Sequence, residues 1–134
     1  MIQTATAADF ELLSDPAEFA LYLGLLAATT SMPELIDVGR ESYQRITDDH
    51  VELYTKLFDH FGVEMVPPHT IKDLVVSAIA LGEGLCLRGL VDPNAVPDDH
   101  DSPDGVPDDA TGPWHLFSIG VLALIRGMTR TSAG

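Results

Sequence analysis

Cysteine is almost absent from this chain, because Cys86 is the only one among its 134 residues. A single thiol cannot form a disulfide within the chain, and it cannot supply the set of thiolates that a structural zinc site needs. We therefore expect Cys86 to be a small buried hydrophobic side chain.

Basic residues are also scarce. Seven Lys and Arg stand against 21 Asp and Glu, which gives a formal net charge of -14 and a pI near 4.3. A surface of this charge repels nucleic-acid phosphates and anionic lipids. We expect that this chain by itself does not bind DNA, even as a dimer.

The chain lacks the marks of secretion and of membrane insertion. Its first basic residue is Arg40, so the positively charged start of a secretory signal is missing. The longest uncharged apolar stretch, residues 19–28, is too short to span a bilayer. The sequence therefore predicts a soluble, cytoplasmic protein that has no membrane partner.

Common catalytic and metal motifs are missing as well. The chain contains no His-Glu-x-x-His, no Gly-x-Ser-x-Gly, no Glu-x-x-His step of a di-iron bundle and no glycine-rich phosphate loop before a lysine. We therefore expect neither an enzyme nor a protein that holds a metal ion or a cofactor.

One segment, residues 92–112, has an unusual composition, with seven Asp and four Pro. It does not match a calcium loop, because Ala110 occupies the position at which such a loop needs a bidentate glutamate. So many like charges and prolines cannot build a core, and we expect a solvated, mobile acidic loop.

Strand-like alternation bounded by hairpin turns is absent, so the predicted fold class is all-α, a helical bundle of four to five helices. Residues 1–14 are interpreted as a short, partly ordered N-terminal segment, and residues 15–134 as one domain. Start and stop residues predict helices over residues 16–30, 33–61, 70–91 and 113–130.

Local capping residues indicate where these helices begin and end. Asp15 is expected to cap the first helix, Thr70 and Asp73 to form a capping box, and Gly62 to end the second helix in the left-handed conformation. Three poor helix formers, Thr47 to Asp49, leave open whether the second helix is one long helix or two abutting ones.

The last two predicted helices are apolar nearly all round, and such helices are normally buried on every side. A chain with so few other helices cannot cover both, so we expect a second copy to do so. In the predicted homodimer the last two helices of each chain form a four-helix bundle. The residues expected in this interface are Leu74, Ala78, Leu85, Phe117, Val121, Leu124, Ile125 and Met128.

Two polar residues in apolar surroundings have more than one interpretation. His50 is either a contact in a pocket or, as is commoner for such a residue, a core histidine that bonds a carbonyl oxygen. Glu83 needs a partner, for which Arg88 and Arg126 are candidates. It either fixes the dimer interface as an ion pair or contacts a ligand.

Several segments taken together resemble a known family. They are Asp15-Pro16 at a helix start, Met32-Pro33-Glu34-Leu35, the stretch from Leu53-Tyr54 to Phe61-Gly62, and Ala80-Leu-Gly-Glu-Gly-Leu-Cys-Leu-Arg88 followed by Val91-Asp92-Pro93. In order and spacing, residues 15–130 resemble the C-terminal domain of TetR-type transcriptional regulators. In that family a basic helix-turn-helix domain precedes this region, the variable helices enclose a pocket for a small, usually apolar ligand, and the last two helices form the dimer. Residues 1–14 are too few for such a DNA-binding domain.

The resemblance implies an effector-sensing and dimerisation domain, in which a small apolar or aromatic molecule shifts the state of a DNA-binding unit located elsewhere. An alternative is an interaction protein that sequesters related regulators in inactive heterodimers and needs no ligand. For the first hypothesis, the residues expected to face the pocket are Phe19, Leu23, Leu26, Tyr43, His50, Tyr54, Phe58, Leu81 and Trp114.

Overall fold

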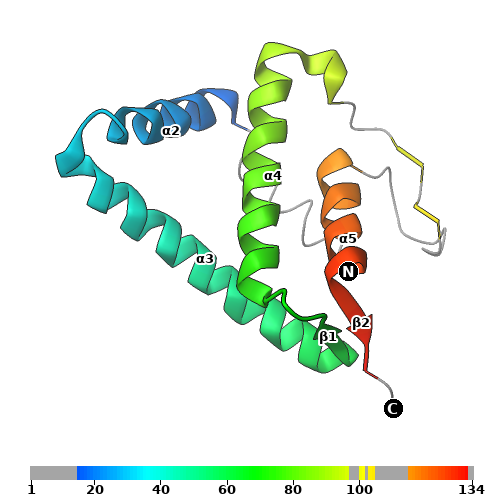
Figure 1. Cartoon of the computed structure of the whole chain (residues 1–134). Coiled ribbons are helices and arrows are strands. Elements are labelled where there is room, and N and C mark those ends of the chain that lie inside the picture. The colour runs from blue at the N-terminus through cyan, green and yellow to red at the C-terminus, as the bar shows by residue number, and fades with distance from the viewer. Residues whose placement is uncertain (1–14, 97–99, 102, 105–114, 133–134) are drawn as a thin grey trace.

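Four α-helices and one small sheet make up the described part of the chain, which comprises residues 15–96, 100–101, 103–104 and 115–132 of a computed structural model (Figure 1). The all-α prediction is therefore confirmed. The elements in chain order are α2 (Pro16–Thr29), α3 (Pro33–Phe61), β1 (Val63–Met65), α4 (Ile71–Val91), the 3-10 turn η1 (Pro93–Ala95), α5 (Leu116–Met128) and β2 (Thr129–Thr131).

The predicted caps form. The Asp15 carboxylate accepts a hydrogen bond from the Glu18 N–H at 3.2 Å at the start of α2. Thr70 and Asp73 make a reciprocal capping box before α4, with N–H to side-chain oxygen distances of 2.8 and 3.2 Å. Gly62 ends α3 with φ 61° and ψ 43°. Because α3 runs for 29 residues without a break, it is one helix and not two.

The sheet is a feature that the sequence analysis missed. β1 pairs with β2 in antiparallel fashion, with Val63 opposite Thr131 and Met65 opposite Thr129. Strands of three residues are too short to show an alternating pattern, and the two partners lie far apart in the sequence. The sheet joins the end of α3 to the end of α5, so it closes the described chain at one end of the bundle (Figure 1).

α5 is shorter than predicted at both ends. His115 has extended backbone angles, φ -76° and ψ 146°, so the helix begins at Leu116 and not at residue 113. It ends at Met128 because Thr129 joins the sheet. Most of the predicted acidic loop 92–112 lies outside the described residues, and its described beginning forms the turn η1.

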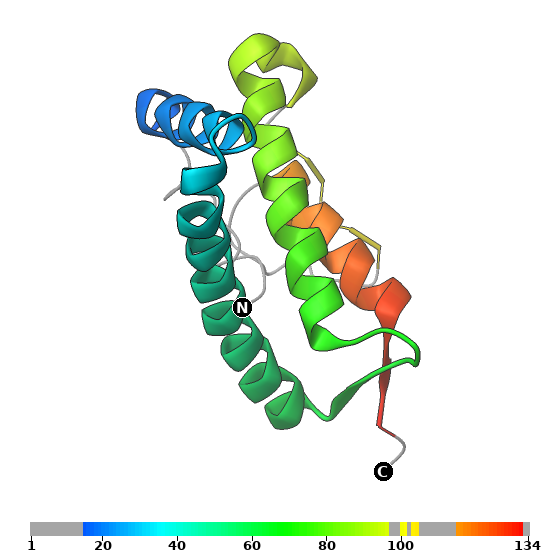
Figure 2. The ribbon, with the colours of Figure 1, turned by 60° about the vertical axis from the view of Figure 1, so that its left-hand side comes forward.

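α4 lies between α3 and α5, and α2 packs against both α3 and α4 (Figures 1 and 2). The core forms where apolar residues repeat at steps of four on α4 and α5 and meet the end of α3. Its fully or almost fully buried members are Phe58, Leu74, Ala78, Phe117, Val121 and Ile125.

Glycines allow α4 and α5 to approach closely. A Cβ atom at Gly82 of α4 would lie 3.1 Å from Cε2 of Phe117, and one at Gly120 of α5 would lie 2.5 Å from Cδ2 of Leu81. Each helix therefore receives a side chain of the other over a position that has no Cβ.

This packing corrects part of the predicted dimer interface. Five of its eight residues are core residues of the single chain, each no more than 8% exposed, so they have almost no surface to offer a partner: Leu74, Ala78, Phe117, Val121 and Ile125. Leu85, Leu124 and Met128 stay partly exposed. An apolar helix face needs burial, but its sequence does not say whether its own chain or a second copy supplies the cover.

One helix of the described residues, α4, is long and apolar enough to cross a bilayer, a property that it shares with core helices of soluble proteins. Its length and composition meet that test although the helix carries Glu83 and Arg88. The predicted absence of a membrane partner stays a prediction.

Candidate functional site

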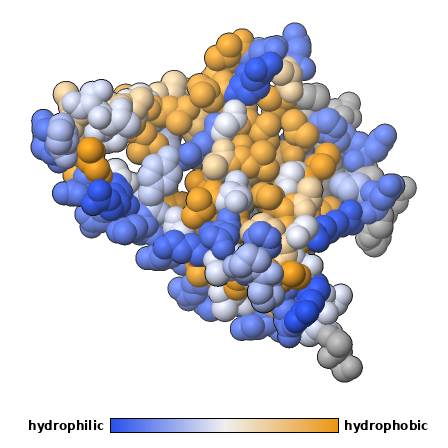
Figure 3. Space-filling model, in the orientation of Figure 1, coloured by the Kyte–Doolittle hydropathy of each residue, from blue (hydrophilic) through white to orange (hydrophobic). Residues whose placement is uncertain are grey.

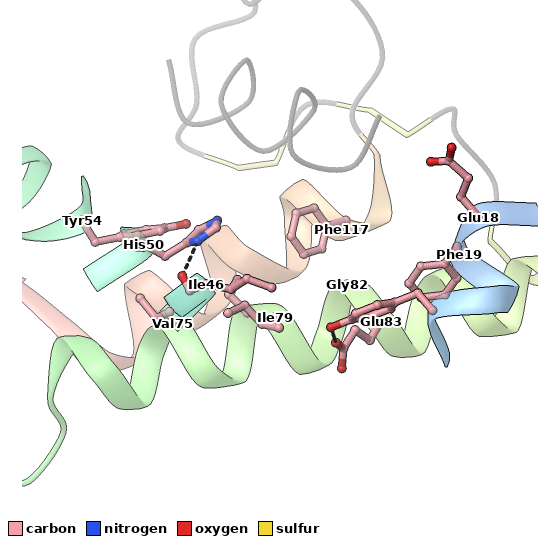
Figure 4. Close-up of a pocket in the computed structure, with 12 residues that line it drawn as sticks. Glu18, Phe19, Ile46, His50, Tyr54, Val75, Ile79, Gly82, Glu83 and Phe117 are labelled. Atoms are coloured by element: carbon pink, nitrogen blue, oxygen red, sulfur yellow. Dashed lines mark hydrogen bonds between the residues drawn. The ribbon is translucent and has the colours of Figure 1, made fainter. Parts of the chain in front are cut away.

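A pocket of about 370 Å³ lies among α2, α3, α4 and the first turn of α5 (Figure 4). Most of its wall is aliphatic or aromatic, and a few polar side chains interrupt it. The residues that line it are Glu18, Phe19, Tyr22, Ile46, His50, Tyr54, Val75, Ala78, Ile79, Gly82, Glu83 and Phe117.

Helical spacing brings these residues together. α3 contributes Ile46, His50 and Tyr54, which are four residues apart and therefore lie on one face of the helix. On α4 the same spacing aligns Val75, Ile79 and Glu83. Figure 4 shows His50 and Tyr54 at one end of this pocket, Glu83 and Phe19 at the other, and Phe117 between them.

Glu83 is the most informative polar residue of the pocket. Its carboxylate accepts a hydrogen bond from the Tyr43 hydroxyl, which lies 2.9 Å from one oxygen and 3.1 Å from the other. The Tyr22 hydroxyl lies 3.5 Å from the nearer oxygen. The acid therefore ties α4 to α3 and α2 at the point where the three helices meet.

Neither of the predicted arginine partners pairs with Glu83. Arg88 lies 3.8 Å from Asp92, four residues further along the chain, and Arg126 donates a hydrogen bond to the backbone oxygen of Asp104 at 2.8 Å. Arg88 shares α4 with Glu83, but a residue five positions away lies on another side of the helix.

The negative charge of Glu83 affects its neighbours. Burial, the hydrogen bond to Glu83 and its charge together raise the pKa of Tyr43 well above the ordinary value for tyrosine. Burial and the same charge also raise the pKa of Tyr22. Both hydroxyls therefore stay protonated near neutral pH and serve as hydrogen-bond donors to the carboxylate.

His50 lies at the other end of the pocket. Its Nδ1 atom is 2.8 Å from the Ile46 carbonyl oxygen, and because a carbonyl only accepts, Nδ1 is the donor in this contact. His50 was interpreted either as a pocket contact or as a histidine that bonds a carbonyl oxygen. In the structure it does both.

The predicted pocket residues are distributed over several places. Phe19, His50 and Tyr54 line the pocket, and Tyr43 contacts it through Glu83. Phe58 belongs to the core. Three others do not line it: Leu81 lines a separate groove, and Leu23 and Leu26 are half-buried on α2. The prediction for Trp114 falls outside the described residues.

Some wall residues were missed although the sequence contained a signal for them. Ile46 precedes His50 and Tyr54 by helical steps, so the same face of α3 already included it. Ala78 and Phe117 had been placed in the dimer interface instead. Tyr22 carried no local signal, because its partner Glu83 is 61 residues away.

A second apolar feature lies on the outside of α4 and α5. Figure 3 shows apolar side chains gathered over these two helices. An open groove between them is lined mainly by small and aliphatic residues, which are Ser77, Ala80, Leu81, Gly120, Ala123, Leu124, Gly127 and Met128.

The described residues offer little reactive chemistry. No three His, Cys, Asp or Glu side chains in that part of the chain are grouped so that they could hold a metal ion. Cys86 is only half-buried, whereas a buried side chain was predicted. Burial together with the charge of Glu83 raises the pKa of its thiol. A thiol in this environment is a poor nucleophile at neutral pH.

Comparison of the chain with protein-family models, with curated proteins and with solved structures gave no match.

Proposed function

We propose that this chain is a ligand-binding and dimerisation domain of the TetR type, which senses a small apolar or aromatic molecule. The observation that carries the proposal is the pocket of about 370 Å³ among α2, α3, α4 and α5. Its size and its largely apolar wall, interrupted by a few polar groups, are typical of small-molecule sites. Binding is the activity that such a wall supports, and the described lining residues include no Ser, Thr, Cys or Lys that could act as a nucleophile.

The position of the pocket explains how a ligand would change the domain. Its wall comes from four helices, and α2 packs against both α3 and α4. A molecule that fits one arrangement of these helices better than another shifts the population toward that arrangement. In the proposed function this shift is transmitted to a DNA-binding unit.

The experiment is a thermal-shift screen of the whole chain against small aromatic and aliphatic compounds. A compound that binds the native state raises the melting temperature. Ile79→Trp adds bulk inside the pocket and should abolish the shift, whereas Val76→Trp introduces the same indole at an exposed position of α4 and should retain it. A screen without any shift, or equal shifts in both variants, would refute the proposed pocket and favour the sequestering protein that needs no ligand.

A further inference from the structure

The pocket holds more negative charge than its own side chains neutralise. Among the described residues, two acids, Glu18 and Glu83, line it, and neither lysine nor arginine does. Glu18 is exposed, whereas Glu83 is half-buried beside the rings of Tyr22 and Tyr43. The carboxylate inside the pocket is therefore Glu83.

Within the described residues, every lysine and arginine either contacts a group other than Glu83 or lies exposed away from it. Arg40, Arg45 and Lys56 pair with acids on their own helix, α3. Arg88 lies near Asp92, and Arg130 lies near Glu64 across the sheet. Arg126 bonds the Asp104 backbone, and Lys72 is an exposed residue in the first turn of α4. None of them forms an ion pair with Glu83.

Two tyrosine hydroxyls satisfy hydrogen bonds of the carboxylate without neutralising it. Burial, and after it the interactions with Glu83, raise the pKa values of both hydroxyls, and a hydroxyl that donates a hydrogen bond leaves the charge of the carboxylate in place. A carboxylate that is removed from water gains from a cation at its side more than from any further neutral donor.

Aromatic rings also line this pocket. Phe19 and Tyr22 form a tilted pair whose ring centroids are 6.2 Å apart, and Tyr54 and Phe117 continue the aromatic wall. The faces of such rings attract positive charge. Figure 4 shows Glu83 near Phe19 at one end of the pocket, which leaves an apolar length toward His50 and Tyr54 for the rest of a ligand.

We propose that the ligand of this pocket is a hydrophobic cation, an amine or ammonium compound whose charged head lies beside Glu83 and whose apolar body lies against Ile46, Ile79 and Phe117. This inference rests on the proposed function, because it names the ligand class of the same site. It changes the expected ligand from a neutral apolar molecule to one with a single positive charge.

The test compares two probes of equal shape. Benzyltrimethylammonium carries a positive charge, and neopentylbenzene has a carbon atom in place of its nitrogen. Isothermal titration of the parent chain should give an affinity for the cation at least about tenfold higher than that for the neutral probe, because ring faces and the carboxylate both favour the charge. This comparison needs no variant and does not depend on how a variant folds.

Charge variants then locate the effect. Glu83→Gln keeps the size of the side chain and an oxygen for the tyrosine hydroxyls, so it should lose most of the preference for the cation and keep only the part due to the ring faces, while neopentylbenzene binds as before. Glu41→Gln changes the net charge by the same amount at an exposed site on α3 that does not line the pocket, and it should change neither affinity. Glu18→Gln, at the exposed end of the pocket, should have only a small effect.

The outcomes separate the two proposals. If neopentylbenzene binds as tightly as the cation, the pocket is a ligand site but the cation preference is wrong. If Glu18→Gln, and not Glu83→Gln, removes the preference, the assignment to Glu83 is wrong. If neither probe binds to the parent chain and the thermal-shift screen is also empty, the proposed function fails together with this inference.

Discussion

Glu83 illustrates how one residue can connect three helices and a candidate site. It lies on α4, accepts hydrogen bonds from tyrosine hydroxyls of α2 and α3, and lines the pocket. Its contacts are hydrogen bonds to tyrosines and not ion pairs, so it connects the helices without a cation beside it, and in the proposal above the cation is supplied by the ligand.

The first prediction concerns the ionisation of the two tyrosines. Their folded pKa values lie above the unfolded value near 10, so their contribution to stability is complete below that pH and is lost as the pH rises through the folded values. Glu83→Gln removes the neighbouring charge and should lower the pH at which Tyr43 ionises. NMR of tyrosine labelled at Cζ measures this directly. An unchanged Tyr43 titration in the variant would contradict the proposed contact.

Gly62 supplies the second prediction at this scale. Its φ of 61° lies in the left-handed region, which a residue with a Cβ adopts only at a cost. Gly62→Ala should therefore lower the free energy of unfolding by about 1 kcal/mol in urea titrations. Gly24→Ala is the matched control, because Gly24 is within α2 with nothing within 4 Å of a new Cβ. It should raise stability, and equal losses in both variants would refute the argument.

At the scale of the element, α4 begins where its local sequence says it should. The Thr70 hydroxyl and the Asp73 carboxylate exchange hydrogen bonds with each other's backbone N–H groups, so two of the first four N–H groups at this helix end have partners. α4 carries walls of both the pocket and the outer groove, so this cap holds the start of the helix on which both depend.

Removing the cap gives the third prediction. Thr70→Ala should lower the free energy of unfolding by about 1 kcal/mol, the usual cost of losing an N-terminal cap. Lys72→Ala, an exposed residue in the same first turn, is the control and should have little effect. Urea unfolding followed by circular dichroism measures both variants, and a loss of equal size in each would contradict the role of the cap.

The same cap should depend on pH. Hydrogen bonds from the Thr70 hydroxyl and backbone lower the pKa of Asp73 below its ordinary value. Its contribution is therefore present above the unfolded pKa and is lost as the pH falls through the lower folded value. The difference in stability between the parent chain and Asp73→Asn should shrink in acid, and a constant difference would show that the charge of Asp73 is not involved.

At the scale of the whole molecule, the outer side of α4 and α5 is the surface that most resembles an interface. Small residues line its groove, which allows the backbone of another helix to approach closely. We propose that a second copy packs here and that the pairs of helices form a four-helix bundle.

The fifth prediction tests this dimer. Ala123→Glu places a charge on an exposed residue of the groove, and the unpaired charge should dissociate the dimer without disturbing the core. Ala27→Glu makes the same change at an exposed residue of α2 and should leave the dimer intact. Sedimentation velocity at micromolar concentration measures both. A parent chain that is monomeric there, or a dimer that survives Ala123→Glu, would contradict the proposed interface.

The sequence by itself determined the helices and several of their ends. Asp15, Gly62, Thr70 and Asp73 act on backbone groups within three or four residues, so these contacts form whatever the rest of the chain does. Part of the pocket was also readable, because His50 and Tyr54 lie on the apolar side of one helix.

Only the tertiary structure decided which surfaces meet. The partners of Glu83 are 40 and 61 residues away, and the strands β1 and β2 pair across more than 60 residues. Apolar faces on α4 and α5 need cover, but packing within the chain gave that cover to Val121 and its neighbours and left the groove around Ala123 open. Hydrophobic burial has no direction and no fixed partner, so a local pattern predicts that a face is covered and not what covers it.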